Sequence, residues 1–299
     1  MAELSVIVHT KNSAETLSAC LSSVKNIADE LIIMDMGSTD NTLKIARQFK
    51  VQILDHPDVG YADPARNKAL QAANKDWILV VDSDEEIPPT LAEKIKELIN
   101  QESDTVAYAF PRRNLIFNKW AQSGWWPDYQ RRLFKRGYVN WPPELHGLPQ
   151  VDGHLTKLAA DEKLAIIHHN YQTIDDFIDR AQRYSTIAAK EMKSGNRKSQ
   201  PSLISAWLEE FTRRWFVDKA YEQNHYGQTL AWLQSSFEAL ALAKYWESLE
   251  FKQSTKLPKL SAQLANAARS AKYWEADLAC QNASGLGKIY WRLRRRFKL

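Results

Sequence analysis

Two carboxylates stand two residues apart at the end of an apolar run, and their type and spacing suit a divalent cation. Asp82, Ser83 and Asp84 follow residues 77–81, Trp-Ile-Leu-Val-Val, which have the composition of a buried strand. In extended backbone, residues i and i+2 project to the same side, so we expect both carboxylates to point together. Mg²⁺ and Mn²⁺ take such oxygen ligands and keep positions open for substrate phosphates. The competing interpretation is a solvated loop, because the chain holds 36 acidic residues and chance Asp-x-Asp matches are frequent.

Two other polar segments could contribute to the same chemistry. Asp35 ends a second apolar run, where it could accept hydrogen bonds from a base or a ribose, and Gly37 would permit the tight turn that follows. Asp40 is better explained as the cap of the next helix. Arg66 falls in the first turns of a predicted helix, where a guanidinium suits phosphate or base recognition, although a surface arginine is an equal alternative on spacing alone.

The elements that must position these residues alternate between strand and helix. Apolar runs predict strands at 4–8, 31–34, 51–54 and 77–81, and the intervening patterns predict helices at 14–24, 42–49 and 63–73. Nearly continuous apolar strands alternating with helices indicate an α/β fold with a mostly parallel, Rossmann-like sheet covered on both faces. Ligands bind such sheets at the carboxyl ends of the strands, which is where the polar segments lie.

The pattern changes in the second half of the chain. Residues 111–150 are rich in Pro, Trp and Arg, which suggests a long functional loop region mixed with strands, and residues 174–193 read as a helix. A linker signal at 199–202 separates this part from a C-terminal stretch with helical periodicity throughout. We therefore expect one domain over 1–198 and a helical, amphipathic extension over 199–299.

Composition narrows the class of protein. The chain has only two cysteines, Cys20 and Cys280, which excludes a disulfide framework and fits a reducing compartment. A strand begins close to Met1 and no apolar run has transmembrane length, so we expect neither a signal peptide nor a membrane span. The whole chain carries +4 and its last twelve residues +6, so residues 1–287 carry −2. A basic tail with amphipathic, Trp-containing helices suits an anionic membrane surface, while core packing and a solvated end are the alternatives.

The ordered set of motifs resembles glycosyltransferase family 2, in the branch of lipopolysaccharide-core glucosyltransferase-like proteins. The segments that carry the resemblance, in order, are Ser5 to Asn12, Asp35 to Thr42, Ala65 to Ala69, Val80 to Glu85, Gly124 to Phe134, and His168 with Asn170 and Tyr171. The resemblance covers roughly residues 4–190.

This resemblance implies a fold of the GT-A type, a nucleotide-sugar donor that is usually a UDP-sugar, and a cofactor of Mn²⁺ or Mg²⁺. It implies that Thr10, Asn12, Asp35 and Arg66 help to bind the nucleotide, with Asp82 and Ser83 beside it. It also implies that Asp84 holds the metal together with Asp82. His168 could be a further metal or diphosphate ligand, although a structural histidine is at least as good an interpretation.

Inversion at the anomeric carbon, also implied, needs a general base within reach of the acceptor hydroxyl. Glu144 is the first candidate and Asp128 the second, and His146 could serve as base or phosphate contact. Gly147 stands where this branch often has an acid, which leaves the identity of the base open.

The predicted function is therefore transfer of a sugar to a glycan or lipid-linked acceptor in cell-envelope polysaccharide or lipopolysaccharide synthesis. We expect it to occur in the cytoplasm, peripherally at the inner membrane. A catalytically inactive sugar-nucleotide-binding protein or a membrane-associated scaffold are the alternatives. A nucleotidyltransferase lacks support because no Gly-rich loop follows the first strand, and the mildly acidic body argues against nucleic acid as a partner.

Overall fold

The computed structural model describes residues 1–57, 63–142, 148–194, 201–252 and 257–297. The chain forms two compact units, and we describe each by itself. The first comprises Met1–Trp120 and Trp125–Gln172, and the second Ala121–Gly124 and Thr173–Leu299. The expected boundary at 198/199 thus lies later than the observed one. The reason is that α5 (Ile174–Ser194) packs along α7 (Asn224–Ser248), where the Lys244 ammonium donates to the Gln182 carbonyl at 2.6 Å.

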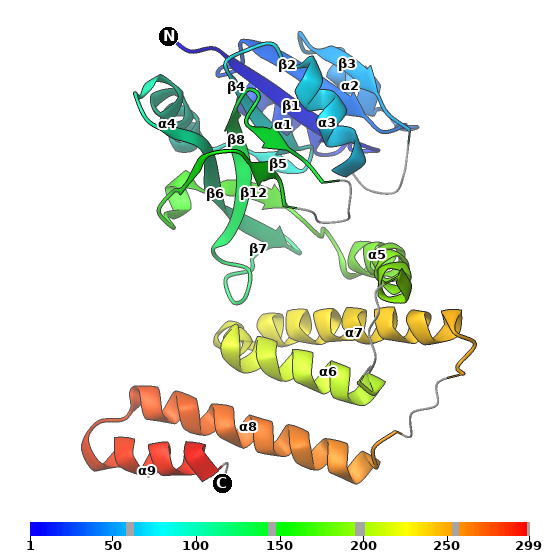
Figure 1. The fold of residues 1–299 in the computed structure, drawn as a ribbon, viewed down its shortest axis with the longest axis vertical. Helices are drawn as coiled ribbons and strands as arrows, with labels where there is room; N and C mark the ends of the chain where they lie inside the picture. The colour runs from blue at the N-terminus through cyan, green and yellow to red at the C-terminus, as the bar shows by residue number, and fades with distance from the viewer. Residues whose placement is uncertain (58–62, 143–147, 195–200, 253–256, 298–299) are drawn as a thin grey trace. The chain divides into compact units, whose positions relative to one another are not determined.

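The first unit is built on a ten-stranded mixed sheet within the described residues (Figure 1). Its main path runs β3-β2-β1-β4-β8-β6-β12-β5, with β7 and β11 paired to β6. Strands β1 to β4 are parallel, and β8 is inserted antiparallel between β4 and β6. The strand bounds are β1 Leu4–Thr10, β2 Glu30–Asp35, β3 Gln52–Asp55, β4 Trp77–Asp82, β5 Glu85–Glu86, β6 Thr105–Ile116, β7 Lys119–Trp120, β8 Asp128–Lys135, β11 His154–Lys157 and β12 Ile166–His169; β9 Val139–Asn140 and β10 Gln150–Val151 form a separate ribbon.

Helices bury both faces of the parallel part of the sheet, strands β1 to β4, as the apolar composition of these strands predicts. Alternate residues of β1 point to opposite sides, so Val6 and Val8 pack with one cluster and Ile7 with the other. The first cluster takes in α1 (Leu17–Val24) and α4 (Pro89–Asn100), and the second takes in α3 (Asp63–Ala72). The predicted α/β class with a helical C-terminal extension is confirmed, and α2 (Thr42–Ala46) completes the alternation.

The start of the first helix differs from the expected one. α1 begins at Leu17, and its N-cap Thr16 makes no side-chain capping bond. Asn12 has a positive φ of 48° and its amide oxygen accepts from the Thr39 backbone N–H at 2.8 Å. Asn12 therefore ties the loop after β1 to the loop after β2.

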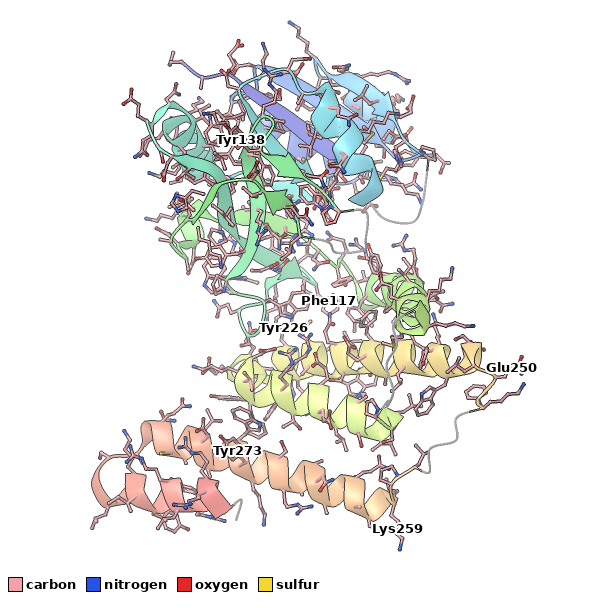
Figure 2. The ribbon with its side chains drawn as sticks, in the orientation of Figure 1. Phe117, Tyr138, Tyr226, Glu250, Lys259 and Tyr273 are labelled. Carbon is pink, nitrogen blue, oxygen red and sulfur yellow. The ribbon has the colours of Figure 1, made fainter. Side chains whose placement is uncertain are left out.

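A two-residue turn extends the sheet beyond β6. Phe117 and Asn118 both have positive φ, at 53° and 58°, as a tight hairpin between β6 and β7 requires. The Phe117 N–H donates to the Tyr171 carbonyl at 2.7 Å, which fixes this turn to the segment after β12. Phe117 is labelled in Figure 2.

The second unit is mainly helical in its described part. Besides α5 and α7 it contains α6 (Leu203–Thr212), α8 (Leu260–Asn282) and α9 (Gly285–Phe297). Trp207, Phe211 and Trp215 stack along one face, with centroids 5.0 and 5.9 Å apart. Among the described helices, none is long and apolar enough to cross a membrane.

Candidate active site

The carboxyl ends of β1, β2 and β4 lie side by side. Thr10 is in register with Asp35, and His9 with Asp82. The order β2-β1-β4 is the reason, because three parallel neighbours end at one edge of the sheet. The structure therefore brings together polar residues that are up to 73 positions apart in the chain, His9 and Asp82.

Asp35 is held by the turn that follows it. Its Oδ2 accepts from the backbone N–H groups of Gly37 and Ser38 at 3.1 and 3.0 Å. Gly37 has a φ of 79°, which only glycine adopts without strain. The second carboxylate oxygen, Oδ1, is buried and makes no hydrogen bond within the described residues. That oxygen is free to accept a hydrogen bond from a ligand.

Asp82 and Asp84 diverge, contrary to the expectation that both carboxylates point together. β4 ends at Asp82, and residues 83–84 form a turn, so the two-residue alternation of a strand no longer holds. Asp82 turns toward Arg66 and Arg132, whereas Asp84 Oδ2 lies 3.4 Å from His168 Nε2. Between them, the Ser83 hydroxyl lies 2.7 Å from that of Ser13.

Both oxygens of Asp82 carry ion pairs. Arg66 Nη2 donates to Oδ1 at 3.0 Å, and Arg132 Nη2 donates to Oδ2. Burial alone would raise the pKa of Asp82, but the Arg132 and Arg66 guanidinium groups hold it well below its usual range. The Arg66 guanidinium also lies 4.5 Å from the Trp141 ring centroid, where a cation–π contact is favourable.

The ion pairs continue across the sheet. Glu85 is fully buried and accepts from Arg132 Nη2 at 2.7 Å and Arg112 Nη1 at 2.9 Å. Arg112 also donates through Nε and Nη2 to Asp128 Oδ2, at 2.9 and 2.7 Å. Three arginines thus face the carboxylates of Asp82, Glu85 and Asp128, which satisfies the requirement that buried charges be paired.

Asp128 is fully engaged in this network. Its Oδ2 also accepts from Asn114, and its Oδ1 accepts from Gln130 Nε2 at 2.7 Å. Burial raises the pKa of Asp128, but Arg112 and these hydrogen bonds lower it overall. A carboxylate stabilised in this way is a weaker base than a free one. Glu144, His146 and Gly147 lie outside the described residues.

His168 and Asp84 are the described pair that best fits a divalent cation. Adjacent ligands of an octahedral metal with bonds of about 2.1 Å lie roughly 3.0 Å apart, close to the observed 3.4 Å. No cluster of three or more His, Cys, Asp or Glu side chains is grouped to hold a metal within the described part of the chain. Mg²⁺ and Mn²⁺ do not need one, because they commonly take one or two protein ligands and fill the rest with water and phosphate.

Several buried polar atoms in this region make no hydrogen bond within the described residues. They are both ring nitrogens of His9, Thr10 Oγ1, Asp35 Oδ1 and the Trp141 indole N–H. Burial, with the neighbouring Arg66 guanidinium, holds the pKa of His9 well below its usual range, so its ring is neutral. Unpaired buried polar groups are costly and rare in folded proteins. Their concentration at the ends of β1 and β2 is what a polar ligand site requires.

Sequence reasoning gave no role to several residues of this site, namely His9, Glu85, Arg112, Asn114, Arg132 and Trp141, although His9, Glu85 and Arg132 lie in segments that carry the family resemblance. The period of two in Asp128 and Gln130 was an available signal, since it places two polar side chains on one face of β8, whereas Arg132 lies at a register irregularity of this strand. Asn67, the residue after Arg66 in the segment from Ala65 to Ala69, holds Trp141 in place. Its amide accepts from the Trp141 N–H at 2.8 Å and donates to the Trp141 carbonyl at 2.7 Å.

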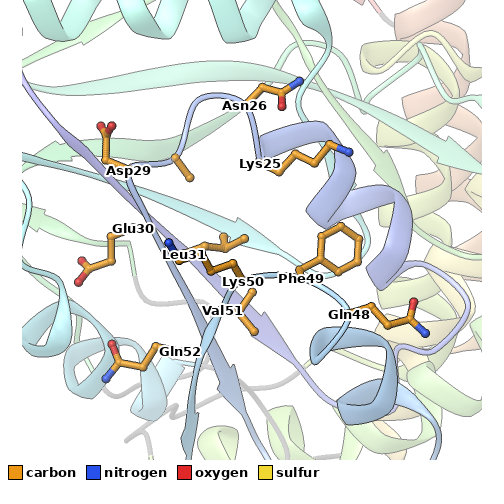
Figure 3. Close-up of a pocket in the computed structure, with 11 residues that line it drawn as sticks. Lys25, Asn26, Asp29, Glu30, Leu31, Gln48, Phe49, Lys50, Val51 and Gln52 are labelled. Carbon is orange, nitrogen blue, oxygen red and sulfur yellow. The ribbon is translucent and has the colours of Figure 1, made fainter.

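A separate hollow lies away from these residues. It is lined by the start of β2 and by the segment before β3, including Lys25, Glu30, Phe49 and Lys50 (Figure 3). It faces the amino ends of the parallel strands, whereas the residues described above lie at their carboxyl ends. We therefore do not assign it to the active site.

Comparison with known proteins gives consistent matches. Residues 5–151 match the model of glycosyl transferase family 2. The chain is 26% identical over 259 residues to an uncharacterized glycosyltransferase of Rickettsia felis, covering 83% of this chain and 91% of that protein. It is 24% identical over 257 residues to the lipopolysaccharide core biosynthesis glycosyltransferase LpsC of Rhizobium meliloti, covering 82% and 92%. Among solved structures, the mannosyltransferase PcManGT of Pyrobaculum calidifontis in complex with GDP-Man and Mn²⁺ matches with a TM-score of 0.45 and 18% identity, over 98% of this chain and 87% of that one.

Proposed function

From its membership of glycosyl transferase family 2, to which residues 5–151 belong, we propose that this protein is an inverting, metal-dependent transferase that uses a nucleotide-sugar, with UDP as the nucleotide. The observation that carries the proposal is the pairing of Asp84 with His168. This pair lies at the edge of the sheet where several buried polar atoms make no hydrogen bond within the described residues. A divalent cation and a nucleotide are complementary to these two features.

The nucleotide would bind at the ends of β1 and β2. Asp35 Oδ1 would accept a hydrogen bond from the base or the ribose, and Thr10 Oγ1 is buried beside it. Asn12 fixes the loop over this position through Thr39. Arg66 adds positive charge, and its pairing with Asp82 keeps the guanidinium oriented.

Asp84 and His168 would hold Mn²⁺ or Mg²⁺. When bound, the ion would neutralise the diphosphate leaving group. The geometry favours His168 over Asp82 as the partner of Asp84, because both oxygens of Asp82 already accept from guanidinium groups. In this arrangement Asp82 serves to position Arg66 and Arg132 rather than to ligate the metal.

The reaction is a single in-line displacement. The acceptor hydroxyl oxygen attacks the anomeric carbon, the bond from that carbon to the diphosphate breaks, and a base takes the hydroxyl proton. Glu144 remains our first candidate for the base. Asp128, the second candidate, is disfavoured. Four hydrogen bonds from Arg112, Asn114 and Gln130 stabilise its carboxylate, which makes it a weak proton acceptor. Asn67 fixes Trp141, three residues before Glu144.

We place the reaction in synthesis of cell-envelope polysaccharide or lipopolysaccharide, with a glycan or lipid-linked acceptor. The support is the likeness to a lipopolysaccharide core biosynthesis glycosyltransferase. An inactive sugar-nucleotide-binding protein on the same fold is the second candidate. What favours it is Gly147, which stands where an acid is expected for the base.

An anionic membrane surface is a further proposed partner, on the cytoplasmic face of the inner membrane. The exposed side chains Leu286, Ile289, Tyr290 and Leu293 of α9 recur at i, i+3, i+4 and i+7, which places them on one stripe. Arg292 and Arg296 flank this stripe on one side and Arg294 on the other, by helical spacing. Apolar residues beside arginines on one helix face are typical of helices that lie in a membrane interface.

The test of the enzymatic proposal is UDP release from a panel of UDP-sugars in the presence of Mn²⁺ and a lipid-linked acceptor extract. We expect turnover by the wild type, and a loss of about 100-fold or more in Asp84→Asn, because metal stabilisation of the leaving group is worth several kcal/mol. Asp152→Asn, at an exposed turn, is the matched control and should retain activity. Thermal stabilisation by UDP with Mn²⁺ but no turnover of any donor would instead support the inactive binding protein.

A further inference from the structure

We propose that Asn114 is a positioning residue that fixes the tautomer of His168 and so directs its Nε2 lone pair toward the metal. This inference deepens the proposed function and rests on it. Asn114 is fully buried on β6, and His168 is its register partner on the parallel strand β12. The two side chains therefore share one face of the sheet.

The orientation of the Asn114 amide follows from its other neighbour. Asn114 Nδ2 lies 2.9 Å from Asp128 Oδ2, and this carboxylate is paired with Arg112, its own register partner. An ionised carboxylate only accepts hydrogen bonds, so the amide must present its NH₂ group to Asp128. The same NH₂ group lies 3.4 Å from the Trp125 carbonyl, which is also an acceptor.

Because the NH₂ group of Asn114 donates to Asp128, its amide oxygen faces His168. Asn114 Oδ1 lies 2.6 Å from His168 Nδ1, and an oxygen acceptor requires a proton on that nitrogen. In a neutral ring the other nitrogen, Nε2, then carries the lone pair. Nε2 is the atom that lies 3.4 Å from Asp84 Oδ2.

Two electron-pair donors therefore converge, the His168 ring nitrogen and the Asp84 carboxylate. Neither has a proton to give the other in this tautomer, and a cation between them satisfies both. Metal-binding histidines generally donate their second ring N–H to an oxygen acceptor, which orients the ring. Asn114 occupies that position here, and Asp128 orients Asn114 in turn.

The first measurement uses the wild-type chain without metal. Long-range ¹H–¹⁵N NMR distinguishes the two neutral tautomers of each of the seven histidines, and His168→Gln assigns the signal of His168. We expect the proton of His168 on Nδ1 in the wild type. A proton on Nε2 in the wild type would overturn the inference, whether or not the protein binds metal.

The second measurement is Mn²⁺ affinity, read from the EPR signal of free Mn²⁺ with UDP present. Asn114→Leu removes both hydrogen bonds at similar volume, and we expect a 10- to 100-fold loss of affinity, the range usual for residues that orient metal ligands. Gln130→Leu is the matched control, because it removes a different hydrogen bond to the same Asp128 and leaves His168 untouched. The Mn²⁺ affinity of Gln130→Leu should stay within about twofold of the wild type, because the group that orients His168 is retained.

The outcomes separate the two proposals. Wild-type binding of Mn²⁺ with equal affinity in Asn114→Leu would refute the role of Asn114 and leave the metal site standing. Absence of Mn²⁺ binding in the wild type would refute the metal-dependent mechanism and the Asn114 inference with it.

Should Asn114→Leu fail to fold, Asn114→Asp keeps an acceptor for His168 but faces Asp128 with a second carboxylate. We expect the Nδ1 proton to remain in that variant, and its loss would count against the inference.

Discussion

At the scale of single residues, the site is organised by buried charges that face one another in alternation. Arg66, Asp82, Arg132, Glu85 and Arg112 form a continuous chain of ion pairs. Each internal member pairs with two neighbours of opposite charge, so its removal takes one ion pair from each of them. Such a network stabilises a single geometry more than it stabilises the fold, because desolvation offsets much of the attraction.

Arg132 is the member whose loss should be most damaging. Arg132→Met leaves Glu85, fully buried, and Asp82 each short of a cation, and we expect a loss of about 3–5 kcal/mol in the free energy of unfolding. Arg131→Met is the control, because the partly exposed Arg131 donates to the Pro149 carbonyl instead of a buried carboxylate. Urea denaturation followed by tryptophan fluorescence measures both. A cost for Arg132→Met no larger than for Arg131→Met would contradict the importance of the network.

The ion-pair network also predicts that the folded protein loses stability at low pH. Burial opposes ionisation of Asp128, but Arg112 together with the hydrogen bonds from Asn114 and Gln130 lowers its pKa overall, and Arg132 and Arg66 lower the pKa of Asp82. A carboxyl with a folded-state pKa below its unfolded value of about 3.9 contributes stability that is present above that value and is lost as pH falls through the folded pKa. The free energy of unfolding should therefore decline as the pH is lowered below about 4. Urea titrations at several pH values should show a shallower decline in Asp128→Asn, and identical slopes would refute this reasoning.

At the scale of elements, strand register determines which side chains meet. His168 is paired with Asn114 on one side and Glu85 on the other, and Arg112 is paired with Asp128. The antiparallel insertion of β8 between β4 and β6 is what brings Arg132 to Asp82. A shift of one residue in β8 would turn Asp128 and Gln130 to the other face.

Two helical glycines give a test of packing at this scale. A Cβ added at Gly227 on α7 would lie 1.9 Å from the Ala220 carbonyl oxygen, so Gly227→Ala should cost about 1–3 kcal/mol or more. A Cβ at Gly287 on α9 would lie 3.8 Å from its nearest neighbour, so Gly287→Ala should raise helix stability by about 0.5–1 kcal/mol. Thermal unfolding followed by circular dichroism compares the two. Equal effects of both substitutions would show that α7 does not pack closely on residues 220–223.

At the scale of the whole molecule, charge is distributed unevenly. The last twelve residues carry six positive charges, and the remaining chain is mildly acidic. In α9, shown in red in Figure 1, Arg295 pairs with Asp277 of α8, while Arg292 and Arg294 form no ion pair within the described part of the chain. Each basic residue near an anionic bilayer contributes about 1 kcal/mol of attraction.

The membrane proposal is tested by sedimentation with phosphatidylcholine vesicles that contain or lack anionic phospholipid. We expect binding only to anionic vesicles, weakened by salt, because the attraction between exposed charges is screened. Replacement of Leu286, Ile289 and Leu293 by Ser should reduce binding at least tenfold, since their apolar side chains would enter the interface. Leu260 and Leu264 on α8, which are about as exposed as Ile289 and Leu293, serve as the control when replaced by Ser. Binding that both sets of substitutions weaken alike would contradict a specific role for α9.

The sequence by itself determined the order of strands and helices and the edge of the sheet where the candidate site lies. Hydrophobic periodicity is a local property, so β1 to β4 and α3 were predictable to within a few residues, and polar residues after each strand marked their carboxyl ends. Tertiary structure alone decided which of those residues meet. The turn after β4 separates Asp84 from Asp82, and β8 and β12 deliver Arg132 and His168 from distant segments. These pairings depend on register and on buried charge balance between strands far apart in the chain, which no local pattern encodes.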